Sequence, residues 1–195
     1  GHSWGGGVAL APAAAHPDRA AGLVLAGSLN PTQPPGVLDV VFGYAFAGPL
    51  LAFVYEAVLR GLPRWPSVRR LLALRMPRPP DESLRRAFVR SYRAWLERGM
   101  WRSFVVEERR YRREQQRLRD DLRRVLAPTV VLVGDRDEFE TVEAAQALAD
   151  AVVDGVLETV SAAGHGIPWS RPGVFVRAIA EVCSAAGSCR DVTMG

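Results

Sequence analysis

The chain has 195 residues, of which 48% are hydrophobic, so it can bury one sizeable core or a core with a small subdomain. Its formal net charge is +4, and its two cysteines, Cys183 and Cys189, are too few for a disulfide framework and lie at no metal-ligand spacing. The charge is unevenly spread: residues 31–126 hold 20 Arg against 10 Asp and Glu, and the rest hold 5 Arg against 11 acidic residues. We interpret this basic segment as a solvated surface, or as a means of recruiting an anionic substrate or an anionic membrane surface.

The opening of the chain contains a serine in the pattern G-x-S-x-G. The sequence begins Gly-His-Ser-Trp-Gly-Gly-Gly, with Ser3 at the centre of the pattern. The Ala-rich stretch that follows predicts a helix as far as His16, which Pro12 should kink or shorten. Residues 22–27 form a short apolar run between two glycines, which is typical of a buried parallel strand. Turn, helix and strand together make half of a β-α-β unit.

The middle of the chain is predicted to be helical. Residues 30–36 are rich in Pro, Asn and Gly and mark a boundary. An uninterrupted apolar run over residues 40–55 has 16 residues, whereas a membrane-spanning helix needs roughly 20. We therefore favour a buried or substrate-facing helical hairpin over peripheral membrane contact. The predicted elements are this apolar hairpin over 37–62, a connector over 63–80, and helices over 81–99 and 101–126.

A regular alternation of strands and helices returns near the C-terminus. Residues 129–133 are apolar and β-branched between a proline and a glycine, which predicts a strand. A helix over 142–153, a strand over 156–160 and a closing helix over 172–186 follow. These elements predict an α/β fold with a parallel sheet.

Two polar loops follow the last two predicted strands. Gly-Asp-Arg-Asp occupies residues 134–137, and Gly-His-Gly occupies residues 164–166. A serine nucleophile needs an imidazole to take its proton and a carboxylate to orient that imidazole. Loops at the carboxyl ends of adjacent parallel strands lie at one edge of the sheet, which brings such groups together. The order Ser, Asp, His predicts Ser3 as nucleophile, Asp135 or Asp137 as acid, and His165 as base.

The helix after Ser3 should also take part in the chemistry. Its N-terminus would point at the site, and its backbone N–H groups can stabilise an oxyanion. We expect Trp4 to supply the first of these donors. We interpret His2 as a filler of the variable position in the motif rather than as a base.

These motifs resemble the α/β-hydrolase superfamily of serine hydrolases with a helical cap. GHSWGG resembles its nucleophile elbow, and residues 16–28, HPDRAAGLVLAGS, resemble the helix end and strand that follow. Residues 128–137, PTVVLVGDRD, resemble its seventh strand and the start of the acid loop after it. In that loop the acid is usually the last Asp of G-x-x-D, so the resemblance favours Asp137. Residues 161–182, SAAGHGIPWSRPGVFVRAIAEV, resemble its histidine loop and last helix.

The resemblance implies how the chain is organised. It implies a hydrolase core over residues 1–30 and 127–187, an inserted all-helical cap over 31–126, and a tail over 188–195. The family has further strands before the elbow, including one that leads into it, and this sequence has none of them. We therefore expect the C-terminal part of an α/β-hydrolase sheet, an elbow without a strand beside it, and little or no activity from this chain alone.

The resemblance also implies an activity and its partners. It implies hydrolysis of a carboxylic ester, thioester or amide with an apolar acyl part through an acyl-enzyme, without a metal or organic cofactor. We expect neither a nucleic-acid nor a membrane partner, and a cytoplasmic location. Alternatives that stay open are an aminopeptidase-like hydrolase, a cofactor-free perhydrolase, and a non-catalytic truncated product or partner-binding fragment.

Overall fold

The structure is a computed structural model that describes residues 1–34, 66–67, 82–97 and 101–187. Contacts within the chain divide it into two compact units, residues 1–33 with 116–195 and residues 34–115. The predicted apolar hairpin over 37–62 and the tail over 188–195 lie outside the described residues, as does the connector over 63–80 apart from residues 66–67.

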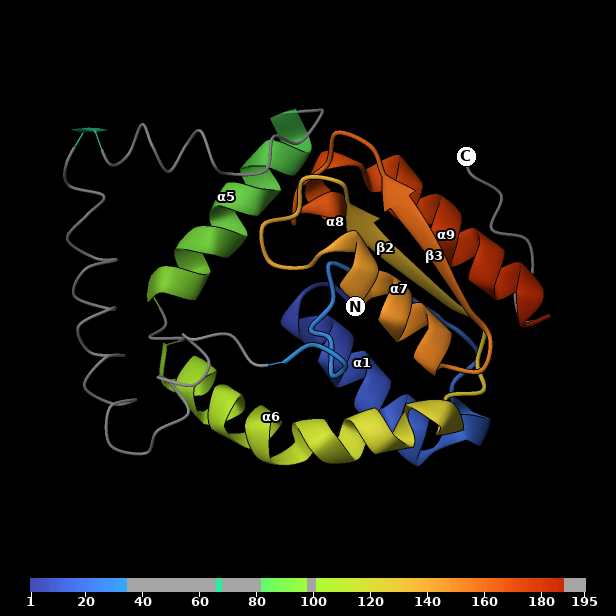
Figure 1. Cartoon of the computed structure of the whole chain (residues 1–195). Helices are drawn as coiled ribbons and strands as arrows, with labels where there is room; N and C mark the ends of the chain where they lie inside the picture. The colour runs from blue at the N-terminus through green and yellow to red at the C-terminus, as the bar shows by residue number, and fades with distance from the viewer. Residues whose placement is uncertain (35–65, 68–81, 98–100, 188–195) are drawn as a thin grey trace. The chain divides into compact units, whose positions relative to one another are not determined.

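The first unit is built on a parallel sheet of three strands (Figure 1). The strands are β1 (Leu23–Ala26), β2 (Thr129–Gly134) and β3 (Gly155–Val160), in the order β1-β2-β3. In register, Leu23 pairs with Thr129, which in turn pairs with Gly155. All three strands were predicted, over residues 22–27, 129–133 and 156–160, and the α/β fold class is confirmed.

The segment that leads into Ser3 adds to this sheet beside β1. His2 forms a parallel bridge with Ala26. The backbone N–H of Ala26 donates to the carbonyl of Gly1, and the N–H of Ser3 donates to the carbonyl of Ala26. The expectation that the elbow has no strand beside it is therefore wrong on the β1 side, because these ladder hydrogen bonds fix the backbone before Ser3.

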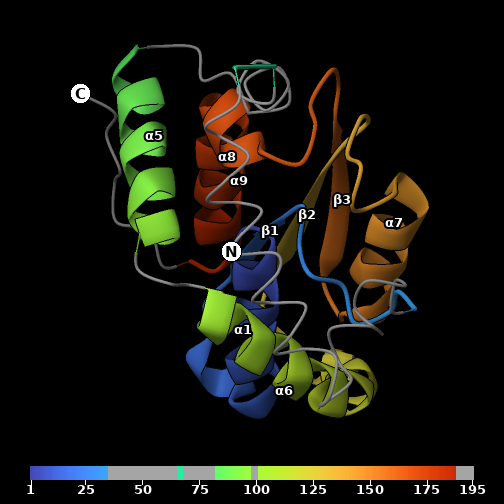
Figure 2. The same ribbon diagram turned by 90° about the vertical axis from the view of Figure 1, so that its left-hand side faces the viewer.

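Helices cover both faces of the sheet (Figure 2). On one face lie α1 (Trp4–Ala15) and α7 (Val142–Ala151), whereas α8 (Ile167–Ser170) and α9 (Pro172–Ala185) lie on the other. Alternate strand residues point to opposite faces, which gives each face its own apolar cluster. Leu25 and Val131 belong to the α1 and α7 face, and Val24 and Leu132 to the α8 and α9 face.

Helix α1 runs past its proline. Pro12 lies inside the helix, which continues to Ala15, so the expected early end does not occur. Pro12 is exposed and stands near the end of α1, where it removes only one backbone hydrogen bond. The neighbouring Leu10 is fully buried and belongs to the same cluster as Leu122. Ala13 and Ala14, which follow the proline, are buried in the same cluster and hold α1 in place beyond it.

One long helix contains the position at which the chain passes from the second unit into the first. Helix α6 (Trp101–Asp121) continues into the short 3-10 helix η3 (Leu122–Arg124). Leu122 and Val125, at the end of the predicted apolar stripe, are buried, and η3 packs against α1. The side chains of Phe104 and Tyr111, at the start of the stripe, lie outside the described residues.

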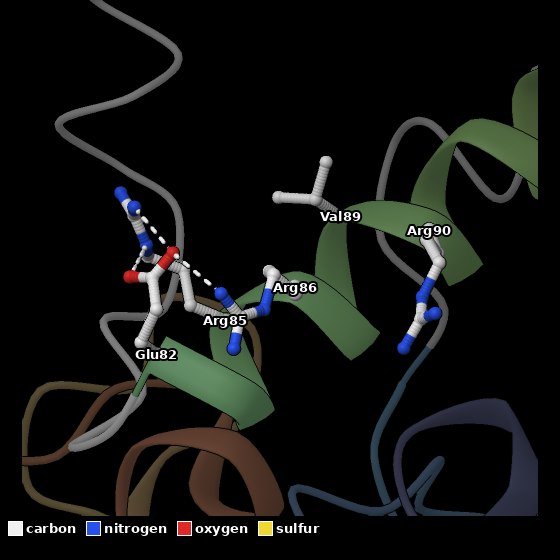
Figure 3. A pocket seen from close by; sticks show the side chains of 5 residues that line it. All are labelled: Glu82, Arg85, Arg86, Val89 and Arg90. Carbon is white, nitrogen blue, oxygen red and sulfur yellow. Dashed lines mark hydrogen bonds and ion pairs between the residues drawn. The ribbon is translucent and has the colours of Figure 1, made fainter.

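The described part of the second unit is dominated by α5 (Glu82–Glu97) and most of α6. Glu82 stands in the first turn of α5, and its carboxylate pairs with Arg85 at 2.8 Å and with Arg86 at 3.9 Å. These side chains, with Val89 and Arg90, line a hollow on α5 (Figure 3). Within the described residues, no helix combines the length and the hydropathy needed to cross a membrane.

Candidate active site

Ser3 stands in a strained turn between the sheet and α1. Its backbone has φ 53° and ψ −125°, a region that non-glycine residues rarely adopt. The N–H of Ser3 bonds to Ala26 in the sheet at 3.0 Å, and its carbonyl accepts from Gly6 in the first turn of α1 at 2.9 Å. Such strain persists only where the surroundings hold it, and it is concentrated at functional sites. The turn directs Ser3 toward the histidine loop.

A chain of hydrogen bonds links the three residues that the motifs single out. Ser3 Oγ lies 2.9 Å from His165 Nε2. On the other side of the ring, His165 Nδ1 lies 3.0 Å from Asp137 Oδ2 and 3.2 Å from Oδ1. Asp137 follows β2 and His165 follows β3, so the side chains meet at the carboxyl edge of the sheet, as expected from the loop positions.

The structure brings Asp137, and not Asp135, to His165. The Asp137 side chain is fully buried, and its Oδ1 accepts hydrogen bonds from the backbone N–H groups of Phe139 at 2.8 Å and Glu140 at 3.2 Å. Burial acts to raise the pKa of Asp137, but the hydrogen bonds from His165, Phe139 and Glu140 outweigh it and lower the pKa below its usual value. Asp135, by contrast, is exposed.

The ionised Asp137 determines the tautomer of His165. A carboxylate can only accept hydrogen bonds, so Nδ1 of the neutral imidazole carries the proton. The lone pair of Nε2 then faces Ser3 Oγ, which donates its hydroxyl proton to it. This is the arrangement that a general base needs to activate a serine.

Trp4 lies where the predicted oxyanion donor should be. It is the first residue of α1 and directly follows Ser3. The positive end of the helix dipole and the first backbone N–H groups of α1 are therefore next to Ser3 Oγ.

Two glycines of the site need their lack of a side chain. Gly27, which ends β1, has φ 47°, and a Cβ there would lie 3.0 Å from His165 Nδ1 and 3.1 Å from Asp137 Oδ2. A Cβ on Gly6, in the first turn of α1, would overlap Ser28 Oγ. Gly6 thus lets α1 approach the loop after β1. Our sequence analysis missed the role of Gly27, and its only signal was a glycine at the end of a predicted strand.

Two further aromatic rings lie against His165. The ring of Phe139 is 4.8 Å away, centre to centre, and this side chain is 74% exposed. The ring of His2 is 5.1 Å away, and its Nε2 donates to the backbone carbonyl of His165 at 2.8 Å. Burial lowers the pKa of His2, which favours the neutral ring. His2 therefore contacts the histidine loop rather than Ser3.

Metal ligands do not cluster in the part of the chain that the structure describes. None of its groups of His, Cys, Asp and Glu side chains could hold a metal ion.

Comparison with known proteins assigns the family. A family profile described as "Alpha/beta hydrolase family" matches residues 1–178. The chain belongs to the alpha/beta hydrolase family. Comparison with the curated proteins gives no significant match.

Solved structures share the fold of this alpha/beta hydrolase. A candidate lipase of Acinetobacter baumannii superposes with a TM-score of 0.66 at 14% identity, over 96% of this chain and 60% of that protein. A thermophilic esterase from Thermogutta terrifontis gives a TM-score of 0.56 at 23% identity, over 95% of this chain and 64% of that one. A serine hydrolase involved in carbazole degradation gives 0.57 at 22% identity, over 95% and 62%. The chain thus spans about 60% of the length of these structures.

Proposed function

We propose that this chain carries the catalytic residues of a serine hydrolase that cleaves a carboxylic ester, thioester or amide through an acyl-enzyme. One observation carries the proposal: Ser3 Oγ, His165 and the buried Asp137 form an unbroken hydrogen-bonded chain, with distances of 2.9 and 3.0 Å, at the N-terminus of α1. The family assignment supports it, because lipases and esterases are among the proteins that share the fold.

The proposed reaction begins with attack of Ser3 Oγ on the substrate carbonyl carbon while His165 Nε2 takes the hydroxyl proton. The backbone N–H of Trp4 stabilises the resulting oxyanion. His165 then gives its proton to the leaving group as the bond to that group breaks, which leaves an acyl ester on Ser3. In the second half, His165 takes a proton from water, the hydroxide attacks the acyl carbon, and the proton returns to Ser3 as the acid is released. Asp137 stabilises the imidazolium in both halves.

The substrate that we propose is a small molecule with an apolar acyl part. Phe139 supports this choice, because its exposed ring lies against the face of His165 and offers an apolar wall beside the reacting groups. The structures that share the fold are longer than this chain, so the proposed activity belongs to the whole protein. We expect the chain alone to be weakly active or inactive.

A fluorophosphonate probe tests the proposed nucleophile, because such probes form a covalent bond with an activated serine. We expect the probe to label the protein at Ser3, and we expect the label to be absent in Ser3→Ala and strongly reduced in His165→Ala. A matched control is Ser170→Ala, which changes a serine in α8 that bonds to the Gly166 carbonyl. Labelling that survives in Ser3→Ala, or its absence from the whole protein, would refute the assignment.

The weak activity of the isolated chain is tested separately. Hydrolysis of p-nitrophenyl acetate is measured for the chain and for its Ser3→Ala variant. Turnover that the wild-type chain shows and the variant loses would contradict the expected inactivity, and it would support the catalytic proposal.

A further inference from the structure

Glu140 is a carboxyl group that is buried beside Asp137 and that the proposed mechanism does not use. Its side chain is 2% exposed. Oε1 accepts a hydrogen bond from Asn30 Nδ2 at 3.2 Å, and the backbone of Ser28 also interacts with the carboxyl, but Oε2 is buried with no partner at hydrogen-bond distance among the described residues. Burying a carboxyl that is only partly hydrogen-bonded reduces stability, so its presence at this position calls for a reason.

The partner of Glu140 is itself held firmly. Asn30 Nδ2 also donates to the carbonyl of Ala144 at 2.7 Å. Asn30 Oδ1 accepts from the backbone N–H of Thr32 at 2.9 Å and from its hydroxyl at 2.7 Å. These bonds fix the orientation of a buried amide. They also connect the loop after β1 to the first turn of α7, and Glu140 joins the acid loop to both.

Glu140 also contacts the proposed acid directly. Its backbone N–H donates to Asp137 Oδ1 at 3.2 Å, and its side chain accepts the hydrogen bond from Asn30. Glu140 therefore links Asp137 to Asn30. Burial raises the pKa of Glu140 to about 7; the Asn30 hydrogen bond opposes this rise, and the charge of Asp137 adds to it. Much of Glu140 is therefore neutral near pH 7, and glutamine has the shape of that neutral form.

We propose that Glu140 is a positioning residue: through Asn30, it holds the acid loop, residues 135–140, against the loop after β1 and so keeps Asp137 aligned with His165. This inference rests on the proposed function, because the alignment matters only if Ser3 and His165 react. Glu140 does not touch the substrate in this scheme, and its effect passes entirely through Asp137.

Hydrogen exchange of the backbone amides, measured on the whole chain, tests whether Glu140 fixes the acid loop. The measurement does not depend on catalytic activity. In Glu140→Ala we expect the backbone amides of residues 137–140 to exchange about tenfold faster, because the tie to Asn30 is lost. Glu140→Gln keeps an acceptor for Asn30 and should restore slow exchange. The matched control is Glu143→Ala, which removes an exposed glutamate in the first turn of α7 and should change nothing. Unchanged exchange in Glu140→Ala would overturn the proposal.

Should Glu140→Ala fail to fold, Glu140→Asp carries the same comparison. This variant keeps the carboxyl group but is one methylene too short to reach Asn30. We expect it to exchange faster than wild type in residues 137–140, and equal exchange would count against the proposal.

The consequence for the reaction is read from steady-state kinetics on p-nitrophenyl acetate. We expect Glu140→Ala to lower kcat by about tenfold to a hundredfold with little change in KM, and Glu140→Gln to recover most of the loss. If the wild type reacts at Ser3 and Glu140→Ala reacts equally fast, the positioning role is wrong while the proposed function stands. If the whole protein, assayed in the same way, shows no Ser3-dependent reaction, the proposed function fails, and hydrogen exchange still decides whether Glu140 holds the loop.

Discussion

Two aspartates lie two residues apart in the acid loop, and their surroundings differ sharply. Asp137 is buried and faces His165, whereas Asp135 is exposed. We expect Asp137→Asn to lower kcat/KM by about 10³–10⁴, because an amide cannot enforce the same imidazole tautomer or stabilise its charged form. Asp135→Asn should stay within about twofold of wild type. Ester hydrolysis by the two variants decides between them, and equal losses would show that the acid is wrongly assigned.

The buried Glu140 should make stability depend on pH. Burial raises its folded-state pKa to about 7 from an ordinary value of 4.5. The unfolded chain therefore loses this proton at lower pH, so the contribution of Glu140 to stability falls as pH rises from 4.5 to 7. The full loss is about 3 kcal/mol, from 1.36 kcal/mol per pKa unit. Glu140→Gln should lack this loss.

The measurement compares urea unfolding of wild type and Glu140→Gln at several pH values. The comparison matters because His2, whose pKa burial lowers, changes stability in the opposite direction within this range, and equally in both proteins. Asp137 and His165 are the titratable side chains next to Glu140, and both are kept in the variant. A constant difference in unfolding free energy between pH 4.5 and 7 would contradict a buried, neutral Glu140.

At the scale of elements, the chain passes close to the site at Gly27, directly after β1. Its φ of 47° strains any residue with a side chain, and a Cβ there would lie 3.0 Å from His165 Nδ1, so the imidazole would have to shift by a few tenths of an ångström. Gly27→Ala should cost about 1–2 kcal/mol in backbone strain and reduce kcat by tenfold or more through displacement of His165. Gly173→Ala, in the first turn of α9 with open space around it, should instead leave kcat unchanged and keep or raise stability. Loss of stability without loss of kcat in Gly27→Ala would count against this close approach.

The site also depends on the contact between η3 and α1. Leu122 is 1% exposed and packs in the cluster that contains Leu10 of α1, the helix that begins beside Ser3. Truncation to Leu122→Ala should cost about 2–5 kcal/mol in unfolding free energy. Leu126 is 58% exposed, and Leu126→Ala should change stability by less than about 0.5 kcal/mol. Similar midpoints of urea unfolding for the two variants would argue against this packing.

At the scale of the whole molecule, local signals predicted the elements of the sheet well. Two of the strands were apolar runs bounded by glycine or proline, a third was predicted over residues 156–160, and the structure places all three in the parallel sheet. The four-residue helix α8 was missed, because one turn beginning after Gly166 has no apolar period to detect. Pro12 misled the prediction, since packing of Ala13 and Ala14 after it outweighed a single lost hydrogen bond.

The candidate site was predictable only in part. Recognisable motifs contain Ser3, Asp137 and His165. Their residue types and their order along the chain indicated that the three side chains come together in the fold. The hydrogen bond between Asn30 and Glu140 joins residues 110 positions apart in the sequence, and each of them looks like an ordinary loop residue. No local pattern shows which of several acidic residues in the acid loop will be buried. That information lies in the packing of α7 on the sheet.

The 162 residues that separate Ser3 from His165 have a consequence for synthesis. On the ribosome, Ser3 emerges well before the base that would activate it. At about 5–20 residues per second, the nascent chain carries its serine without an imidazole for roughly 8–30 s. β1 must also wait for β2, since the connection between them spans residues 27–128. Such long-range pairing is slow to form, so a nascent chain would gain reactivity only after His165 has emerged and β1 has paired with β2.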